Sequence, residues 1–350
     1  MTRRFLSPVE ASLLAALCVP AILQAAAAKV TCATCHRQEA QFQPQSAMGI
    51  GLELPAKQQV LEAHPKLSFE ANGYRYDIER KSGISIYTVS DGSGKLSLPI
   101  QYAFGVHNLT FVFEYQGHYY ESLVTYYEPI QGLGITIGDS RVQPHNLVEA
   151  MGRRTSDHEI VDCFGCHASN AVSRGKLTLP TMQPGLTCEH CHTGAEAHLE
   201  AMSSGKPAPL PRKLGEMAAE EMSGFCGQCH RTWESVVGQH LFGQKNVRFQ
   251  PYRLAISQCF LGDDMRIRCT ACHNPHVDLD RDDSHYDHAC LACHVGKTAT
   301  VANAVTHKSC PVADKNCVTC HMPKVPAPGV PSIFSDHNIR IAHAGDPYPE

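Results

Sequence analysis

The sequence lacks several features that would place the chain in other classes. It has no basic patch interleaved with aromatic residues, so we do not expect a nucleic-acid-binding protein. Only 18% of its residues are charged, and the formal net charge is −4, so charge alone points to no partner. After residue 28 no apolar stretch is long enough to span a membrane. No unit of fixed length repeats along the chain, which argues against a solenoid. Cysteine and histidine, in contrast, are abundant.

Seven Cys-x-x-Cys-His motifs, numbered 1 to 7 in chain order, contain 14 of the 17 cysteines. Random placement of 17 Cys and 21 His in 350 residues would give roughly 0.05 such motifs. The motifs are Cys32, Cys35 and His36; Cys163, Cys166 and His167; Cys188, Cys191 and His192; Cys226, Cys229 and His230; Cys269, Cys272 and His273; Cys290, Cys293 and His294; and Cys317, Cys320 and His321. This pattern is the attachment signature of c-type haem, in which two thioethers hold the porphyrin and the histidine binds iron.

Three other uses of paired cysteines fit the sequence less well. Zinc ribbons use Cys-x-x-Cys pairs without requiring a histidine directly after the second cysteine. A thioredoxin-like redox site needs one such pair, and a disulfide framework does not depend on the following residue. Because all seven pairs are followed by His, we predict seven covalently attached haem c groups. Their propionates would make the loaded protein more acidic than the sequence pI of 6.6.

The second axial ligand of each haem decides whether it only carries electrons or also binds a substrate. His276 follows His273 too closely to bind the opposite face of the same haem, so we expect it to reach a neighbouring one. The first candidates for distal ligands are His198, His276, His307 and His337; His107 and His158 come next, then His145, His240, His285 and His288. Met48 is a thioether alternative, or a side chain that fills a gap. We interpret His64 and His118 as ordinary residues.

The chain divides into five predicted segments. Residues 1–28 are predicted to be a signal peptide, with Arg3 and Arg4 before an apolar stretch and alanines before the cleavage site. The alternative is an uncleaved anchor. Residues 29–55 form the first haem segment, 56–154 a β-rich insert domain, 155–343 a six-haem cytochrome domain and 344–350 a tail. Haem attachment and a signal peptide together predict a periplasmic or extracellular protein.

The insert carries strand and turn signals. Alternating runs at residues 74–78 and 84–89 are typical of strands, and the segment 91–94 is a turn signal. Gln116-Gly117 between two further runs predicts a hairpin. The predicted fold class is a mostly irregular and α-helical multihaem cytochrome c, with short helices around packed haems and a small antiparallel β domain. Cys259 and Cys310 remain outside the motifs; we favour a disulfide between them, with two free thiols as the alternative.

Several segments carry a resemblance to a known family. They are Cys188 through His192 with Gly194 and His198, Ser257 through Phe260, Cys269 through His276, Cys317 through Lys324, and Asp336 through Ile339. In these segments the chain resembles the multihaem cytochrome c superfamily that includes hydroxylamine oxidoreductase and its tetrahaem electron acceptor. It is most similar to exported multihaem cytochromes that are often fused to tetratricopeptide repeats. The resemblance implies that His198, His276, His307 and His337 are distal ligands.

The chain departs from this family at two points. The first motif of the tetrahaem relatives is followed by Ser-x-His, where this chain has Ser46-Ala47-Met48. No tetratricopeptide region follows residue 343, so we do not expect the partner-binding module of the fused relatives.

Two functions follow from the sequence. The first is an exported heptahaem c-type cytochrome that passes electrons between redox partners through closely packed, mostly bis-His haems. Its expected partners are redox proteins, or quinol oxidase or dehydrogenase complexes, with assembly into a larger redox complex as an extension. The alternative is a multihaem oxidoreductase in which one open haem reduces or oxidises a small nitrogen or sulfur compound. No motif has Lys in place of the proximal His, as in the distantly similar pentahaem nitrite reductases, so the enzyme assignment stays uncertain.

Overall fold

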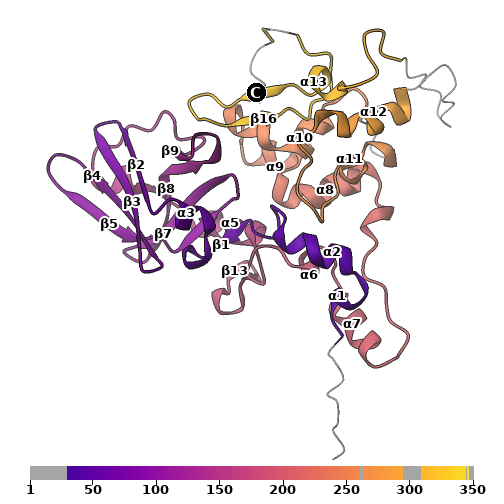
Figure 1. The fold of residues 1–350 in the computed structure, drawn as a ribbon, viewed down its shortest axis with the longest axis horizontal. Coiled ribbons are helices and arrows are strands. Elements are labelled where there is room, and N and C mark those ends of the chain that lie inside the picture. The colour runs from indigo at the N-terminus through magenta and orange to yellow at the C-terminus, as the bar shows by residue number, and fades with distance from the viewer. Residues whose placement is uncertain (1–29, 261–263, 295–308, 344, 347–350) are drawn as a thin grey trace, which may run out of the picture.

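The computed structural model describes residues 30–260, 264–294, 309–343 and 345–346. The predicted signal peptide, the candidate ligand His307 and most of the predicted tail lie outside the described residues. A group of β-strands occupies one side of the molecule, and helices α8 to α13 occupy the other (Figure 1). The N-terminal helices α1 and α2 lie between them beside α6 (Figure 1).

A four-stranded antiparallel sheet forms the outer layer of the β-rich part. Its strand order is β2-β3-β4-β5. The strands are β2 (Lys66–Ala71), β3 (Tyr74–Lys81), β4 (Ile84–Ser90) and β5 (Lys95–Pro99). Their side chains alternate between buried and solvent-facing, as the period-two pattern predicts. The turn predicted at residues 91–94 is confirmed, because Asp91 closes it with a hydrogen bond from its backbone N to the Gly94 carbonyl at 3.1 Å.

A six-stranded antiparallel sheet packs beneath it, with the order β1-β6-β7-β8-β10 and with β9 also paired to β8. The strands are β1 (Leu52–Glu53), β6 (Tyr102–Phe104), β7 (Asn108–Tyr115), β8 (His118–Tyr127), β9 (Gly132–Ile135) and β10 (Gly152–Arg154). The predicted hairpin is confirmed: β7 and β8 pair from Tyr115 and His118 inward. Gln116 and Gly117 have φ values of 52° and 77°, as a two-residue type I′ turn requires.

The two sheets bury a common core of aromatic and β-branched residues. Tyr87 and Val89 of β4 are fully buried against Phe111 and Phe113 of β7. The Tyr87 and Phe113 ring centroids are 5.1 Å apart. This sandwich builds its own core from side chains and needs no cofactor to bury apolar surface.

A second apolar cluster joins the sandwich to the helix that ends in motif 2. Phe164 of α5 (Asp157–His167) is fully buried against Phe104 and Val112 of the six-stranded sheet. The Phe104 and Phe164 rings meet edge to face, with centroids 5.3 Å apart. The sandwich therefore supports motif 2 directly.

The described α-helices are short. Those that contain or end in a motif are α1 (Cys32–Cys35), α5, α6 (Cys188–Cys191), α8 (Ala219–His230), α11 (Cys269–Cys272), α12 (Asp287–His294) and α13 (Cys317–His321). The others are α2 (Arg37–Phe42), α3 (Gln59–Ala63), α4 (Leu147–Met151), α7 (Ala195–Ser203), α9 (Trp233–Gly238) and α10 (Gln250–Ala255). Three strand pairs lie among them: β11 (Ala168–Ser169) with β14 (Gln183–Pro184), β12 (Val172–Ser173) with β13 (Lys176–Leu177), and β15 (Lys324–Pro326) with β16 (Ile333–Ser335).

The predicted fold class is wrong. The described residues form sixteen strands in five antiparallel sheets, with 24% of these residues in strands, alongside thirteen short α-helices. The chain is therefore a mixed structure in which β-sheet is a major part, rather than a mostly helical cytochrome with a small β domain. The sandwich contains a large core of its own side chains. Among the helices described, none is long and apolar enough to cross a membrane.

Candidate functional site

Each motif lies on one helical turn. Residues three apart on a helix lie on the same face, so both cysteines of each motif project to one side. The following histidine either ends the helix or caps it, as His36 caps α1 and His192 caps α6. At His36 the backbone leaves helical geometry, with φ −96° and ψ 61°. The local fold therefore presents two thiols and an imidazole together, as covalent haem attachment requires.

The cysteines and histidines of motifs 1 to 6, with Val318 and Thr319 of motif 7, line one continuous cavity with a volume of 2780 Å³. A pocket for a single small ligand measures about 300–1,000 Å³. The candidate ligands that also line the cavity are Met48, His107, His158, His198, His276 and His337. The cavity is therefore large enough for several bulky groups and is surrounded by the residues predicted to hold them.

Cysteines of motif 4 lie close to cysteines of motif 2 and of motif 5. The proximity of Cys166 and Cys229 lowers the pKa of Cys166 and raises the pKa of Cys229. Cys226 and Cys269 are close in the same way, which raises the pKa of Cys226 and lowers the pKa of Cys269. Motif 4 therefore touches motif 2 through its second cysteine and motif 5 through its first.

Two further contacts join motif 1 to motif 3 and motif 6 to motif 7. Burial raises the pKa of Cys188, and the neighbouring Cys32 thiol raises it further. Burial raises the pKa of Cys317 to about 12, with contributions from Asp287 and from Cys290. The pair of Cys290 and Cys317 thus connects the last two motifs.

The remaining links run from motif 3 to 4 and from motif 5 to 6. Beyond hydrogen bonding and burial, the Cys191 thiol adds to the raised pKa of Cys226 and Cys229. Burial raises the pKa of Cys272 to about 11, and the Cys290 thiol adds to it. The motifs therefore follow one another in the order 1-3-4-5-6-7, with motif 2 beside motif 4.

Two pairs of imidazoles face each other at the spacing of axial ligands on one metal. The ring centroids of His192 and His276 are 6.0 Å apart, with an interplanar angle of 6°. Those of His273 and His337 are 6.1 Å apart, with an angle of 40°. With metal–nitrogen bonds of about 2.0–2.1 Å, two imidazoles on opposite sides of one metal have centroids about 6 Å apart. The structure thus brings His276 to motif 3 and His337 to motif 5.

Several imidazoles donate a hydrogen bond from one ring nitrogen to a backbone carbonyl. Nδ1 of His167 lies 2.9 Å from the Gly51 carbonyl oxygen, and Nδ1 of His321 lies 2.9 Å from that of Arg340. Nδ1 of His198 lies 3.0 Å from the Pro209 carbonyl oxygen, and Nδ1 of His337 lies 3.0 Å from the Ser335 carbonyl oxygen. A carbonyl oxygen can accept a hydrogen bond only from a ring nitrogen that carries a proton, so Nδ1 is protonated in these histidines. In the neutral imidazole Nε2 then keeps its lone pair and can bind a metal.

Burial favours the neutral form of four motif imidazoles and of His337. Desolvation lowers the pKa of His167, His192, His230 and His273. It lowers that of His337 to about 4. A metal binds neutral imidazole, so these histidines are ready to act as ligands at neutral pH.

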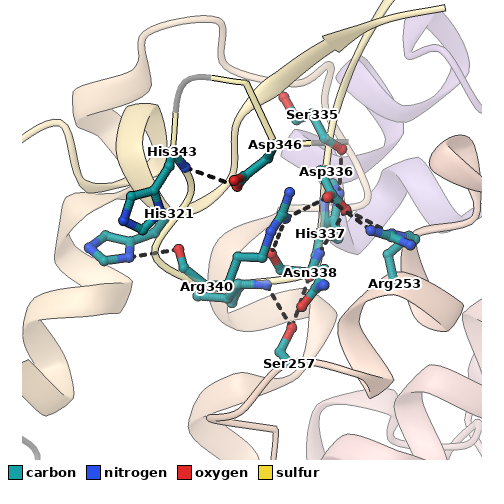
Figure 2. A network of polar contacts seen from close by, with 11 residues as sticks. Arg253, Ser257, His321, Ser335, Asp336, His337, Asn338, Arg340, His343 and Asp346 are labelled. Atoms are coloured by element: carbon teal, nitrogen blue, oxygen red, sulfur yellow. Dashed lines mark hydrogen bonds and ion pairs between the residues drawn. The ribbon is translucent and has the colours of Figure 1, made fainter. Parts of the chain in front are cut away.

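A polar network holds His337 and His321 in place (Figure 2). Asp336 is fully buried and forms a bidentate ion pair with Arg253 of α10, with distances of 2.8 and 3.0 Å. It also accepts a hydrogen bond from Arg340 at 2.6 Å. Sequence reasoning did not assign a role to Arg253, Asp336 or Arg340, although Asp336 lies directly before a predicted ligand.

The other candidate histidines are engaged elsewhere. His107 has Nδ1 at 2.7 Å from a Glu128 carboxylate oxygen and Nε2 at 3.0 Å from an Arg281 nitrogen. The structure therefore gives both nitrogens of His107 protein partners. Nδ1 of His158 lies 3.9 Å from Asp162, and its side chain is 79% exposed.

The remaining candidate ligands, His145, His240, His285, His288 and Met48, have different local contacts. His285 pairs with Asp280 at 3.2 Å, and His288 Nδ1 lies 2.6 Å from the His285 carbonyl oxygen. The ring of His240 contacts Phe242, and the backbone N of His145 donates to Glu149. Met48 lines the cavity, and its carbonyl accepts a hydrogen bond from the Leu186 backbone N at 3.1 Å.

The residues expected to be ordinary have local partners. His64 Nε2 lies 3.2 Å from the Tyr126 hydroxyl, and His118 Nδ1 lies 3.0 Å from an Arg154 nitrogen. Cys259 and Cys310 are both free thiols, so the favoured disulfide is not formed. Cys310 is exposed, whereas Cys259 is half-buried close to Cys290 and Cys293 of motif 6.

Unpaired polar atoms in the cavity wall fit a bound group that carries carboxylates. Arg268 Nε and Thr270 Oγ1 are buried and have no hydrogen-bond partner. A haem propionate would supply acceptors for them.

Haem iron needs only two protein ligands, because the porphyrin supplies the other four. Pairs of imidazoles therefore suffice, and within the described ranges no group of three or more His, Cys, Asp or Glu is placed to hold a bare metal ion.

Comparison with family models, with curated proteins and with solved structures finds no match for this chain.

Proposed function

We propose that the chain binds seven haem c groups and acts as an exported electron carrier between redox partners. Seven Cys-x-x-Cys-His motifs on one cavity support this proposal, and the two facing imidazole pairs carry it. Each bound haem would supply a one-electron centre whose potential depends on its axial ligands and surroundings. The export signal predicted for residues 1–28 supports a location in the periplasm or outside the cell.

The distal pairing in this proposal concerns two haems. His192 and His276 would bind the haem of motif 3, and His273 and His337 the haem of motif 5. Two imidazoles fill both axial positions, which favours electron transfer over substrate binding. His276 belongs to the segment after motif 5 yet would bind the haem of motif 3, so it would tie these two haems together.

The contacts between motifs support a continuous path. The order 1-3-4-5-6-7, with motif 2 beside motif 4, follows from the neighbouring thiols described above. Thioether cysteines lie at the haem edges, so neighbouring cysteines bring haem edges together. Redox proteins, or quinol oxidase or dehydrogenase complexes, would be the partners at the ends of this path.

Coulometric titration of the haem-loaded protein tests the proposal. A carrier should take up seven electrons per chain and return them to an external redox mediator. In the presence of nitrite, hydroxylamine or sulfite, the reduced protein should show no catalytic reoxidation. Sustained turnover of one of these compounds would instead support an enzyme.

The surroundings of His167 favour a second candidate, an oxidoreductase of a small nitrogen or sulfur compound. The ring in contact with His167 is Phe104, at 5.3 Å. In the described part of the chain no second imidazole is in ring contact with His167, and the same holds for His36, His230 and His321, so what distinguishes His167 is the nearby Arg248. Arg248 is close enough to lower the pKa of His167, after the larger effect of burial. The haem of motif 2 would then have an open position. Binding of one carbon monoxide per reduced protein would support this candidate.

A further inference from the structure

The segment 335–342, here called the strap, connects two motifs to the rest of the fold. It follows β16 and runs past motif 7, where the backbone N of Arg340 donates to the His321 carbonyl at 3.1 Å. The Arg340 carbonyl in turn accepts from His321 Nδ1 at 2.9 Å. Two residues into the strap, His337 faces His273 of motif 5. One short segment thus contacts His321 of motif 7 directly (Figure 2) and, through His337, the imidazole of motif 5.

Asp336 anchors this strap. Its carboxylate is fully buried and accepts four hydrogen bonds: two from Arg253, one from Arg340 and one from the Asn338 backbone N at 3.0 Å. These bonds use the full acceptor capacity of a carboxylate. Arg253 itself is only 3% exposed, so the ion pair is shielded from water. Removing one partner of such a pair leaves an uncompensated buried charge and is strongly destabilising.

Ser257 supports the strap from the same side as Arg253. Its hydroxyl donates to the His337 carbonyl at 3.1 Å and accepts from the Ile339 backbone N at 2.8 Å. His337 is therefore held in three ways: its Nδ1 donates to the Ser335 carbonyl, its own carbonyl accepts from Ser257, and the preceding residue, Asp336, is anchored by Arg253.

We propose that Asp336 is a positioning residue that holds His337 on the haem of motif 5 and, through Arg340, orients His321 on the haem of motif 7. This inference rests on the proposed haem binding. A residue that holds a metal ligand in place without touching the metal fixes the orientation of the ligand's ring and so tunes the metal. It would keep the haem of motif 5 closed to external ligands.

The variant Asp336→Asn in the full-length, haem-loaded protein tests the proposal. The amide keeps the size of the side chain but cannot accept all four hydrogen bonds. We expect seven haems to remain attached, one haem to change from low-spin to high-spin in the electron paramagnetic resonance spectrum, and carbon monoxide binding to rise by one per protein. Asp346→Asn is the matched control, because exposed Asp346 accepts only from the His343 backbone N, and it should leave both readouts unchanged.

A double-mutant cycle separates positioning from general structural damage. If Asp336 acts through His337, then Asp336→Asn combined with His337→Ala should bind no more carbon monoxide than His337→Ala alone. Additional carbon monoxide binding or haem loss in the double variant would indicate a merely structural role and would overturn the proposal.

Ser257→Ala decides the question if Asp336→Asn does not fold, because it loosens the strap without leaving a buried charge. We expect a partial rise in carbon monoxide binding from it. Wild-type spectra and carbon monoxide stoichiometry in every folded variant would overturn the role of Asp336. Absence of covalent haem from the wild-type protein would instead overturn the proposed function, so the two failures are distinguishable.

Discussion

His192 and His276 lie with their rings nearly parallel, at a centroid distance of 6.0 Å and an angle of 6°. The first belongs to motif 3, whereas the second follows motif 5 in the chain. The fold therefore places a histidine that follows motif 5 by three residues beside motif 3. This cross-pairing is the basis of the first prediction.

His276→Ala should open the haem of motif 3 without detaching it. Two thioethers and His192 would still hold the group, but the sixth position would lose its ligand. We expect seven haems per protein and one additional equivalent of bound carbon monoxide after reduction. His118→Ala is the control, because His118 contacts Arg154 on the β-sandwich. Unchanged carbon monoxide binding in His276→Ala would show that His276 is no ligand.

Tyr87→Phe should destabilise the β-sandwich by about 1 kcal/mol, which is the typical net value of one hydrogen bond. The Tyr87 hydroxyl is buried and donates to the Met151 carbonyl at 3.0 Å. Urea unfolding followed by far-ultraviolet circular dichroism measures the loss. Tyr115→Phe, which removes an exposed contact with Gln116, should change the free energy of unfolding by less than about 0.5 kcal/mol. Equal effects in the two variants would refute the importance of the buried bond.

Glu159 should stabilise helix α5 in a pH-dependent manner. Burial raises its pKa, but hydrogen bonds from Ser156 and the ion pair with Arg153 outweigh burial, and the net pKa is lowered. A carboxyl whose folded pKa is lowered stabilises the fold above its unfolded pKa, and the contribution is lost as pH falls through the folded pKa. Glu159→Gln should therefore cost roughly 0.5–1 kcal/mol at pH 7.

Urea unfolding of the wild type and Glu159→Gln at several pH values measures this effect. The difference in the free energy of unfolding should be constant above the unfolded pKa of a glutamate, about 4.3, and should vanish as pH falls below the lowered pKa of Glu159 in the folded protein. Glu79→Gln, which removes only an exposed contact of 3.9 Å with Lys66, should show little difference at any pH. A Glu159→Gln penalty that persists at low pH would contradict the assignment.

The two cysteines outside the motifs should be free in the exported, haem-loaded protein. Fourteen cysteines would be thioethers, and Cys18 would leave with residues 1–28, so the denatured protein should react with two equivalents of a maleimide without reductant. In the native protein Cys310 should react first, because backbone hydrogen bonds from Ala313 and Val312 lower its pKa, whereas burial raises that of Cys259. Reaction only after reduction would indicate a disulfide.

The local chemistry of the site was predictable from the sequence, because it depends on near neighbours. The Cys-x-x-Cys-His pattern specifies one helical turn, and Gln116-Gly117 specifies a two-residue hairpin turn. The fold class was not predictable in the same way. Strands of two residues, such as β11 and β12, carry no periodicity, and the sandwich core depends on contacts between strands that are far apart in the sequence.

The tertiary partners were also beyond the reach of the sequence. Arg253 and Asp336 are each unremarkable in their local context, and only the fold brings them together. The groups that orient His167 and His321 are backbone carbonyls, which every residue has, so the residue types do not reveal them. The disulfide prediction for Cys259 and Cys310 was wrong because it rested on counting leftover cysteines and not on their positions.

The most direct test of the account is the covalent haem content of the exported protein. Pyridine haemochrome absorbance, normalised to protein concentration and combined with the intact mass, gives the number of haems per chain. The account predicts seven, all retained after denaturation and acid extraction. A protein that is exported and folded in a strain competent for haem attachment, but carries no covalent haem, would contradict the account.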